Sequence, residues 1–302
     1  MPKKATPSTA RPRATTPASD TPPAPSAELL RELTGKSHWL RRELFQMVMA
    51  TKKGHIPSSF SCTELLVSLY YGGFLRHRKG EPHDPSRDRL IVSKGHAAMA
   101  LYPILADIGF VPPGELANFT RKDALLRMYA DPSIPGIDAI SGSLGHGLGI
   151  ASGMCLAAKQ DGRDQRAFVV LGDSECYEGS VWESAYFAAH QGLDNLVAIV
   201  DRNGLAIMGR TEELCRIGSL EEKFRSFGWE SLSIDGHSYG EILPALGRLG
   251  RTGGKPLAII ANTVKGKGIS FMENRSEWHN RMPNEAEQRQ AWLDLETNTI
   301  AN

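Results

Sequence analysis

The chain has 302 residues, of which 41% are hydrophobic and 23% are charged, and its formal net charge is +1. With this net charge, no overall positive field is expected to attract nucleic acid or a membrane surface. No apolar run approaches the roughly 18 residues that a membrane span needs. The four cysteines lie far apart and form no CxxC pair. That spacing argues against a zinc site and favours a reducing, cytoplasmic compartment.

Residues 1–26 differ in composition from everything after them. They are mainly Pro, Ala, Thr and Ser, with four basic residues and a single acid, Asp20. Such a segment cannot bury enough apolar surface to offset its chain entropy, so we expect a disordered tail. An organellar transit peptide is the alternative, although the segment lacks an amphipathic arginine-rich helix. Residues 27–302 are expected to form one domain.

Apolar periodicity outlines the first half of this domain. The expected elements are helices over residues 29–49, a loop over 54–59, a helix over 62–71, a buried strand over 89–93 with an alanine-rich helix after it, and a Gly/Ser loop from 140 that opens a helix ending near 159. The helices are predicted from apolar residues at three- and four-residue spacings, which give each helix one buried face.

The second half alternates strands with helices. Apolar residues 167–171 and 196–200 predict two strands, and the segment 180–191 between them predicts a helix. Such a unit has parallel strands and a right-handed crossover. Two further strands, over 230–234 and 257–263, are separated by another helix. The pattern predicts the α/β fold class, with a doubly wound, mostly parallel sheet flanked by helices.

Two polar side chains follow the ends of neighbouring predicted strands. Asp173 lies in a Gly-Asp-Ser loop after the strand over 167–171, and Asn203 lies in Asp-Arg-Asn-Gly after the strand over 196–200. In such sheets ligands bind beyond the carboxyl ends of the strands, and oxygen ligands of this kind suit Mg²⁺ or Ca²⁺ beside a phosphate. On this fragment alone an ordinary turn is the alternative, because Gly, Asp and Asn all favour turns.

Longer motifs carry a resemblance to a known family. The run GDSECYEGSVWESAYFAAHQGLDNLVAIVDRNGL closely resembles the diphosphate-binding motif of transketolases. SKGHAA, SGSLGHGLG, VKGKG and SFMENRSEWHN resemble further transketolase segments, in the family's order, so that the resemblance covers about residues 30–285. It implies a thiamine diphosphate-binding fold, with Mg²⁺ (or Ca²⁺ in its place) as the metal. The implied activity is transfer of a two-carbon ketol unit from a ketose donor to an aldose acceptor.

The resemblance also implies roles for individual residues. Asp173 and Asn203 match the family's metal ligands, with the backbone carbonyl of Leu205 as the third protein ligand. The positions expected to bind the cofactor are Gly142, Ser143, Leu144, His146, Gly172, Asp173, Ser174, Glu178, Asn203 and Leu205. Among these, Glu178 matches a glutamate in a carboxylate network at the subunit interface.

Three of the nine histidines match catalytic residues of the family. His55, His96 and His279 match histidines that face the thiazolium, the diphosphate and the sugar oxygens. Neutral imidazole can donate to a developing alkoxide or shuttle a proton near pH 7, so we expect these three to be catalytic. Histidines with no such match are expected to be surface or satisfied polar residues, namely His38, His77, His83, His190 and His237.

The sequence departs from the family near the expected substrate channel. Glu64 stands where many full-length transketolases carry a further histidine, and residues 129–132 replace the common Gly-His-Pro-Glu. The usual pentose phosphates therefore cannot be assumed, and sugar phosphates or sugars stay open as substrates. Lys94, Lys265 and Lys267 are either phosphate contacts or solvated surface lysines.

Full-length transketolases are more than twice as long as this chain. After residue 283 only about 20 residues follow, with a short helix expected over 285–295. We therefore expect a split enzyme, in which a second chain supplies the pyrimidine-binding domain and its catalytic glutamate, with two copies of each chain in the complex. One alternative is a non-catalytic relative. Another is the α subunit of a 2-oxo acid dehydrogenase, which shares the Gly-Asp…Asn motif but is not expected to carry SKGHAA or EWHN.

Overall fold

The computed structural model describes residues 25–300, apart from the side chains of 298–300. The predicted tail over residues 1–26 therefore lies outside the described residues, except for Pro25 and Ser26. Ser26 is the N-cap of the first helix, and its hydroxyl accepts a hydrogen bond from the backbone N–H of Leu29 at 3.2 Å. Such a cap satisfies one of the backbone donors left free at a helix N-terminus.

Five strands form one sheet in the order β1-β2-β3-β5-β4. The strands are β1 (Arg89–Val92), β2 (Ala167–Gly172), β3 (Leu196–Arg202), β4 (Glu230–Asp235) and β5 (Leu257–Asn262). Every pairing between them is parallel. The predicted strands and the parallel β2–α6–β3 unit are thereby confirmed.

Helices connect the strands. The α-helices are α1 (Ala27–Thr51), α2 (Ile56–Phe60), α3 (Thr63–Tyr71), α4 (Leu101–Asp107), α5 (Gly147–Gln160), α6 (Gly179–His190), α7 (Thr211–Leu214), α8 (Leu220–Ser226), α9 (Tyr239–Leu246) and α10 (Glu285–Ile300). Short 3-10 helices are η1 (Gly95–Ala100), η2 (Pro113–Asn118), η3 (Ser174–Tyr177) and η4 (Ser276–Trp278).

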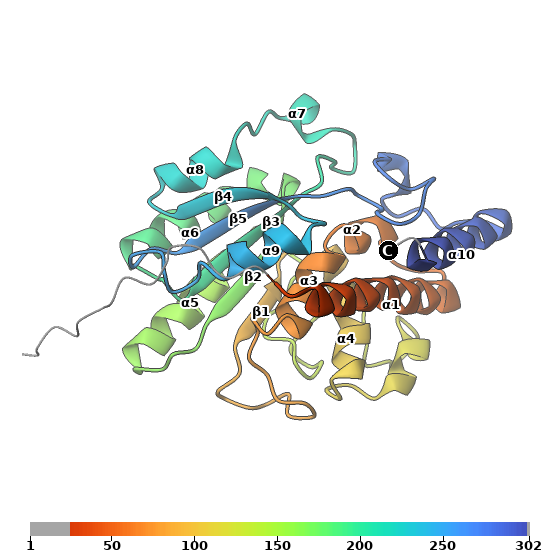
Figure 1. The fold of residues 1–302 in the computed structure, drawn as a ribbon, viewed down its shortest axis with the longest axis horizontal. Helices are drawn as coiled ribbons and strands as arrows, with labels where there is room; N and C mark the ends of the chain where they lie inside the picture. Colours follow the sequence, from red (N-terminus) through yellow and green to blue (C-terminus); the bar gives the residue numbers. More distant parts are fainter. Residues whose placement is uncertain (1–24, 301–302) are drawn as a thin grey trace, which may run out of the picture.

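The sheet is covered on both faces. One hydrophobic cluster joins one face to α1, α3, α4, α9 and α10, and a second joins the other face to α5, α6 and α8 (Figure 1). Successive strand residues alternate between the two clusters, as Val169 and Val170 of β2 do. Burial on both faces explains why β2, β3 and β5 are nearly continuous apolar runs, whereas the edge strand β4 alternates polar and apolar residues. The predicted doubly wound α/β architecture is confirmed.

Three predicted segments differ in detail from the structure. The loop expected over residues 54–59 contains helix α2, which begins with Ile56 and Pro57 and is buried throughout. Proline is well suited to a first helical turn, because the N–H that it lacks is free there anyway. The alanine-rich segment after His96 starts as a 3-10 helix before α4, and α10 runs five residues beyond the expected end at 295.

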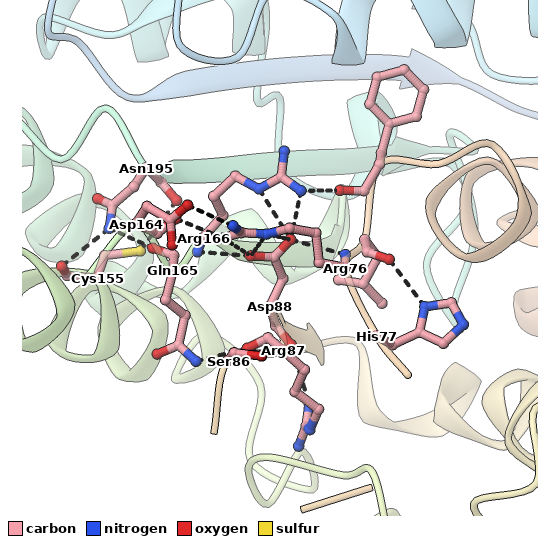
Figure 2. Close-up of polar contacts among 12 residues, drawn as sticks. Arg76, His77, Ser86, Arg87, Asp88, Cys155, Asp164, Gln165, Arg166 and Asn195 are labelled. Atoms are coloured by element: carbon pink, nitrogen blue, oxygen red, sulfur yellow. Dashed lines mark hydrogen bonds and ion pairs between the residues drawn. The ribbon is translucent and has the colours of Figure 1, made fainter. Parts of the chain in front are cut away.

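The amino ends of β1 and β2 are tied together by a buried carboxylate. Asp88, directly before β1, accepts hydrogen bonds from the guanidinium groups of Arg76 and Arg166 and from the backbone N–H of both residues (Figure 2). Although burial alone would raise the pKa of Asp88, these donors hold it below its ordinary value. This edge of the sheet is therefore closed by charged groups that satisfy one another.

The described part of the chain contains no helix that is both long enough and apolar enough to cross a membrane. All four cysteines are free thiols, and three of them, Cys62, Cys155 and Cys176, are buried.

Candidate active site

A cavity of about 250 Å³ opens at the carboxyl edge of the sheet, beyond the ends of β2 and β3. Many of the residues singled out from the sequence line it, namely His96, Leu144, Gly172, Asp173, Ser174, Asn203, Leu205 and His279. The topology brings these residues together because neighbouring parallel strands end at the same edge.

Asp173 is held in place by backbone donors from two loops. One carboxylate oxygen accepts from the Ser174 N–H at 2.8 Å, and the other accepts from the Gly204 N–H at 2.6 Å. The side chain is buried, and burial, followed by the nearby charge of Asp201, raises the pKa of Asp173 to about 6. Because the surroundings of Asp173 disfavour its ionised form, a bound cation would stabilise the carboxylate.

Asn203 and Leu205 complete a group of oxygen donors on this side of the cavity. The Asn203 side-chain carbonyl accepts from the Leu205 N–H at 3.1 Å, and its amide donates to Asp201 at 3.4 Å. The Leu205 carbonyl accepts from the ammonium of Lys265 at 3.1 Å. One carboxylate, one amide oxygen and one backbone carbonyl are a donor set that fits Mg²⁺, which takes its remaining ligands from water and phosphate.

This donor set differs from a cage of acidic or sulfur ligands. Among residues 25–300 there is no cluster of three or more His, Cys, Asp or Glu side chains able to hold a metal ion. A site with a single carboxylate depends on its ligand's phosphate oxygens to complete the coordination. The residues present therefore fit a metal that arrives together with a diphosphate.

Of the three histidines predicted to be catalytic, His96 and His279 line the cavity, and His55 lies against both of them but is not part of the lining. The ring centroids of His55 and His96 lie 5.6 Å apart, those of His55 and His279 lie 5.3 Å apart, and those of His96 and His279 lie 5.2 Å apart. They come from three segments far apart in sequence, before α2, in η1 and after η4. The buried Nδ1 atoms of His55 and His279 have no hydrogen-bond partner among the described residues. Such atoms fit a polar ligand that binds between the rings.

Burial keeps these imidazoles neutral. Desolvation, followed by the charge of Lys94, lowers the pKa of His96 to about 2. Desolvation and the charge of Lys265 lower the pKa of His279 to about 3, and the same two causes lower the pKa of His55. At neutral pH each ring therefore offers one N–H donor and one acceptor nitrogen.

Two of the three lysines left open by the sequence are buried at the site. Lys94 donates to Asp201 and to the Ser58 carbonyl, the latter at 2.8 Å. Lys265 lines the cavity, and burial, followed by the charge of Lys94, lowers its pKa to about 8. A solvated-surface role is therefore wrong for both. It does fit Lys267, whose side chain is 42% exposed and lies 3.9 Å from Glu273.

Other expected site residues lie outside this cavity. Gly142, Ser143 and His146 are exposed in the loop before α5, and Glu178 is exposed at the N-terminus of α6. The loop itself is close to the cavity because Gly95 lets its backbone approach: a Cβ added at Gly95 would lie 1.7 Å from the Ser141 carbonyl. Position 95, in the SKGHAA motif, therefore requires glycine, because any side chain there would clash with this loop.

Several cavity residues were missed in the sequence. They are Ser58, Glu175, Tyr177, Ala206, Ile207 and Met208. Glu175 lies inside the diphosphate motif and could have been found as a second acid beside Asp173. Ile207 and Met208 lie in a loop after β3, and no periodicity in the sequence predicts the path of that loop. Their position at the cavity therefore had no sequence signal.

Glu64 lies away from the cavity. Its carboxylate pairs with Arg41 at 2.7 Å and accepts from Nδ1 of His237 at 2.9 Å. Despite burial, which raises it, these partners lower the pKa of Glu64 to about 2. The second ring nitrogen of His237 accepts from the Val264 N–H at 2.8 Å. His237 is thus a satisfied polar residue, as predicted.

Comparisons with known proteins agree with this geometry. Residues 38–297 match the family model described as transketolase, thiamine diphosphate binding domain. A relative from Phocaeicola vulgatus, named as one subunit of apulose-4-phosphate transketolase, is 37% identical, over 80% of this chain and 86% of its own length. A 6-deoxy-6-sulfo-D-fructose transketolase subunit of a Clostridium species is 38% identical, over 88% and 96%. Human transketolase is 37% identical, but the match covers only 41% of its length.

Solved structures show the same fold. The transketolase of Campylobacter jejuni superimposes with a TM-score of 0.80 at 28% identity, covering 91% of this chain and 45% of that one. A transketolase of Pichia stipitis gives a TM-score of 0.81 at 22% identity. The chain therefore belongs to the transketolase family, and it carries that family's thiamine diphosphate-binding domain.

Proposed function

We propose that this chain is the diphosphate-binding subunit of a split transketolase, which transfers a two-carbon ketol unit from a ketose to an aldose. One observation carries the proposal. The cavity is lined by oxygen donors and an ammonium group that fit a metal and a diphosphate, yet the chain matches nearly the whole length of relatives named as transketolase subunits and only about two fifths of human transketolase. The family membership argues for this reading over that of a 2-oxo acid dehydrogenase α subunit.

The residues of the cavity have distinct roles in this proposal. Asp173, Asn203 and the Leu205 carbonyl would hold Mg²⁺. Ser174 and the Lys265 ammonium, which line the same cavity, would hold the diphosphate. When bound, thiamine diphosphate supplies the electron sink for breaking and forming the bond beside a sugar carbonyl.

The histidines act on the sugar. Because burial keeps His55, His96 and His279 neutral, each can donate a hydrogen bond to a carbonyl or hydroxyl oxygen and accept one in return. A neutral imidazole N–H placed where a sugar oxygen gains negative charge lowers the barrier to ketol transfer. The same ring can donate its proton to that oxygen and take it back within the site. The substrate would be a sugar phosphate or another sugar.

A partner chain is expected to cover the cavity and supply the missing half of the site. Exposed apolar side chains lie at the cavity: Ile207 and Met208 form part of its wall and are 63% and 83% exposed. Large apolar groups left in water next to a polar pocket are typical of a surface that another chain covers. We expect two copies of each chain in the assembly.

Affinity purification of the tagged chain from its native host tests the proposal. We expect a stoichiometric second transketolase subunit, and ketol transfer by the pair only when Mg²⁺ and thiamine diphosphate are present. The Asp173→Ala variant should form the same pair but show no transfer. If the chain purifies alone and binds no thiamine diphosphate with Mg²⁺, the chain is instead a non-catalytic relative.

A further inference from the structure

One buried carboxylate outside the expected metal ligands joins three segments of the site. Glu175 is 1% exposed and belongs to η3, directly after the Gly172–Ser174 loop. One of its oxygens accepts from the Ser93 hydroxyl and from the Gly145 N–H, the latter at 2.8 Å. The other accepts from the Gly172 N–H at 2.9 Å.

These hydrogen bonds connect the two walls of the cavity. Gly145 follows Leu144, which lines one wall, and Gly172 belongs to the wall that carries Asp173. Ser93 extends the connection, because its hydroxyl also accepts from the Gly147 N–H at 3.1 Å, at the start of α5. Three segments, at the end of β1, before α5 and at the end of β2, are therefore fixed to a single side chain.

In the loop before α5, the Gly145 carbonyl accepts from the Ser180 hydroxyl at 3.1 Å, while the Gly145 N–H donates to Glu175. Gly142 and Ser143 are exposed, and Gly145 adopts φ +83, a conformation that residues with a side chain rarely adopt. A Cβ at Gly145 would lie 2.6 Å from Glu178 and Ser180, so the loop passes close against the start of α6. Without a fixed acceptor for the Gly145 N–H, cofactor binding would have to order this loop at the expense of affinity.

We propose that Glu175 is a positioning residue, which holds the Leu144 wall at a set distance from the Asp173 wall before any cofactor binds. This inference rests on the proposed function for the identity of the cofactor. The hydrogen bonds of Glu175, however, are a property of the free chain. The role needs an acceptor at both carboxylate oxygens, since Glu175 accepts from N–H groups on either side. An amide cannot replace it, because its NH₂ would face another donor.

The Glu175→Gln variant tests the inference in two ways. In the free chain, hydrogen exchange at the Gly145 and Gly147 amides should accelerate at least tenfold, while exchange in β4 and β5 stays unchanged. In the pair with its partner, the thiamine diphosphate concentration for half-maximal activity should rise roughly tenfold or more, with kcat at saturating cofactor within about threefold of the parent. The matched control is Glu222→Gln, an exposed position on α8, which should change neither quantity.

Two further variants separate positioning from simple loss of packing. Glu175→Asp keeps both acceptor oxygens on a shorter side chain and should recover part of the lost affinity. Ser93→Ala removes the hydroxyl link, and its effect should be less than additive with that of Glu175→Gln, because both changes release the same loop. Ser93→Ala also serves as the test if Glu175→Gln does not fold.

The outcomes are distinguishable. Unchanged exchange at Gly145 and Gly147, or exchange that rises equally throughout the sheet, would overturn the inference. So would a change in kcat without a change in cofactor affinity. If the parent pair transfers no ketol unit at all, the proposed function is wrong, but the exchange measurement on the free chain still decides the role of Glu175.

Discussion

Lys94 and Asp201 form an ion pair beneath the candidate active site, and neither side chain is more than 1% exposed. Lys94 follows β1, whereas Asp201 is in β3, so the pair crosses below the end of β2. Asp201 also accepts from the hydroxyls of Ser61 and Thr263, and Lys94 donates to the Ser58 carbonyl. Both charged groups are thus paired and hydrogen-bonded, which is what a buried charge requires.

Removing the cation should destabilise the chain strongly. In Lys94→Met the Asp201 carboxylate stays buried without its partner, and we expect the free energy of unfolding to fall by about 3–5 kcal/mol. Urea denaturation of the free chain measures this. The control is Lys267→Met, whose ammonium is exposed and 3.9 Å from Glu273, and it should cost less than about 1 kcal/mol. Equal effects of the two substitutions would contradict the assigned role of the buried pair.

Asp173 should make the stability of the metal-free chain depend on pH. Burial and the charge of Asp201 raise the pKa of Asp173 from 3.8 to about 6. Between these values the folded chain keeps a proton that the unfolded chain has released, so the contribution of Asp173 to stability is present below pH 3.8 and is lost as pH rises through 6. The charge on Asp173 therefore costs stability at pH 7 until a cation binds.

The Asp173→Asn variant isolates this contribution because its side chain does not ionise. Relative to the parent, the unfolding free energy of the variant should rise by up to about 3 kcal/mol between pH 4 and pH 7. Urea denaturation at both pH values, with the metal removed by a chelator, measures the difference. In the assembled pair the same variant should lose Mg²⁺-dependent binding of thiamine diphosphate. A stability difference that is independent of pH would refute the raised pKa.

His279 should contribute to the rate without titrating in the working range. Desolvation and Lys265 lower its pKa to about 3, so the ring stays neutral between pH 6 and pH 8. We expect His279→Ala to lower kcat by roughly 10²–10⁴-fold, the usual contribution of a positioned proton donor or acceptor. His83→Ala, at an exposed position before β1, is the control. An unchanged rate in steady-state assays of the His279 variant would mean that this residue is not catalytic.

The sequence predicted the parts of the site that depend on strand ends. Asp173 and Asn203 could be placed together because a βαβ unit puts the ends of its two strands at one edge of the sheet. His237 could be taken as a satisfied polar residue because nothing beside it in sequence suggests chemistry. Its partners, Glu64 and Val264, could not be named, since both contacts depend on packing between segments far apart in the chain.

Contacts across the sheet were beyond sequence reasoning. Lys94 reads equally well as a phosphate contact or a surface cation, and only the register of three strands brings it to Asp201. The short helix α2 was missed for a similar reason. Its residues carry two serines and a proline, which favour a loop locally, but tertiary packing buries all of them in helical form.

The carboxylate at the opposite edge of the sheet provides a stability test that is independent of the active site. Asp88 is fully buried between Arg76 and Arg166, whereas Asp164, which also pairs with Arg76, is 90% exposed. Asp88→Asn leaves one buried acceptor oxygen for the guanidinium groups of Arg76 and Arg166, which are 40% and 27% exposed, and we expect unfolding to become easier by about 1–3 kcal/mol. Asp164→Asn should cost less than about 1 kcal/mol. Thermal unfolding of the two variants measures the contrast. Similar losses in both would mean that solvent, rather than Asp88, satisfies the arginines at this edge.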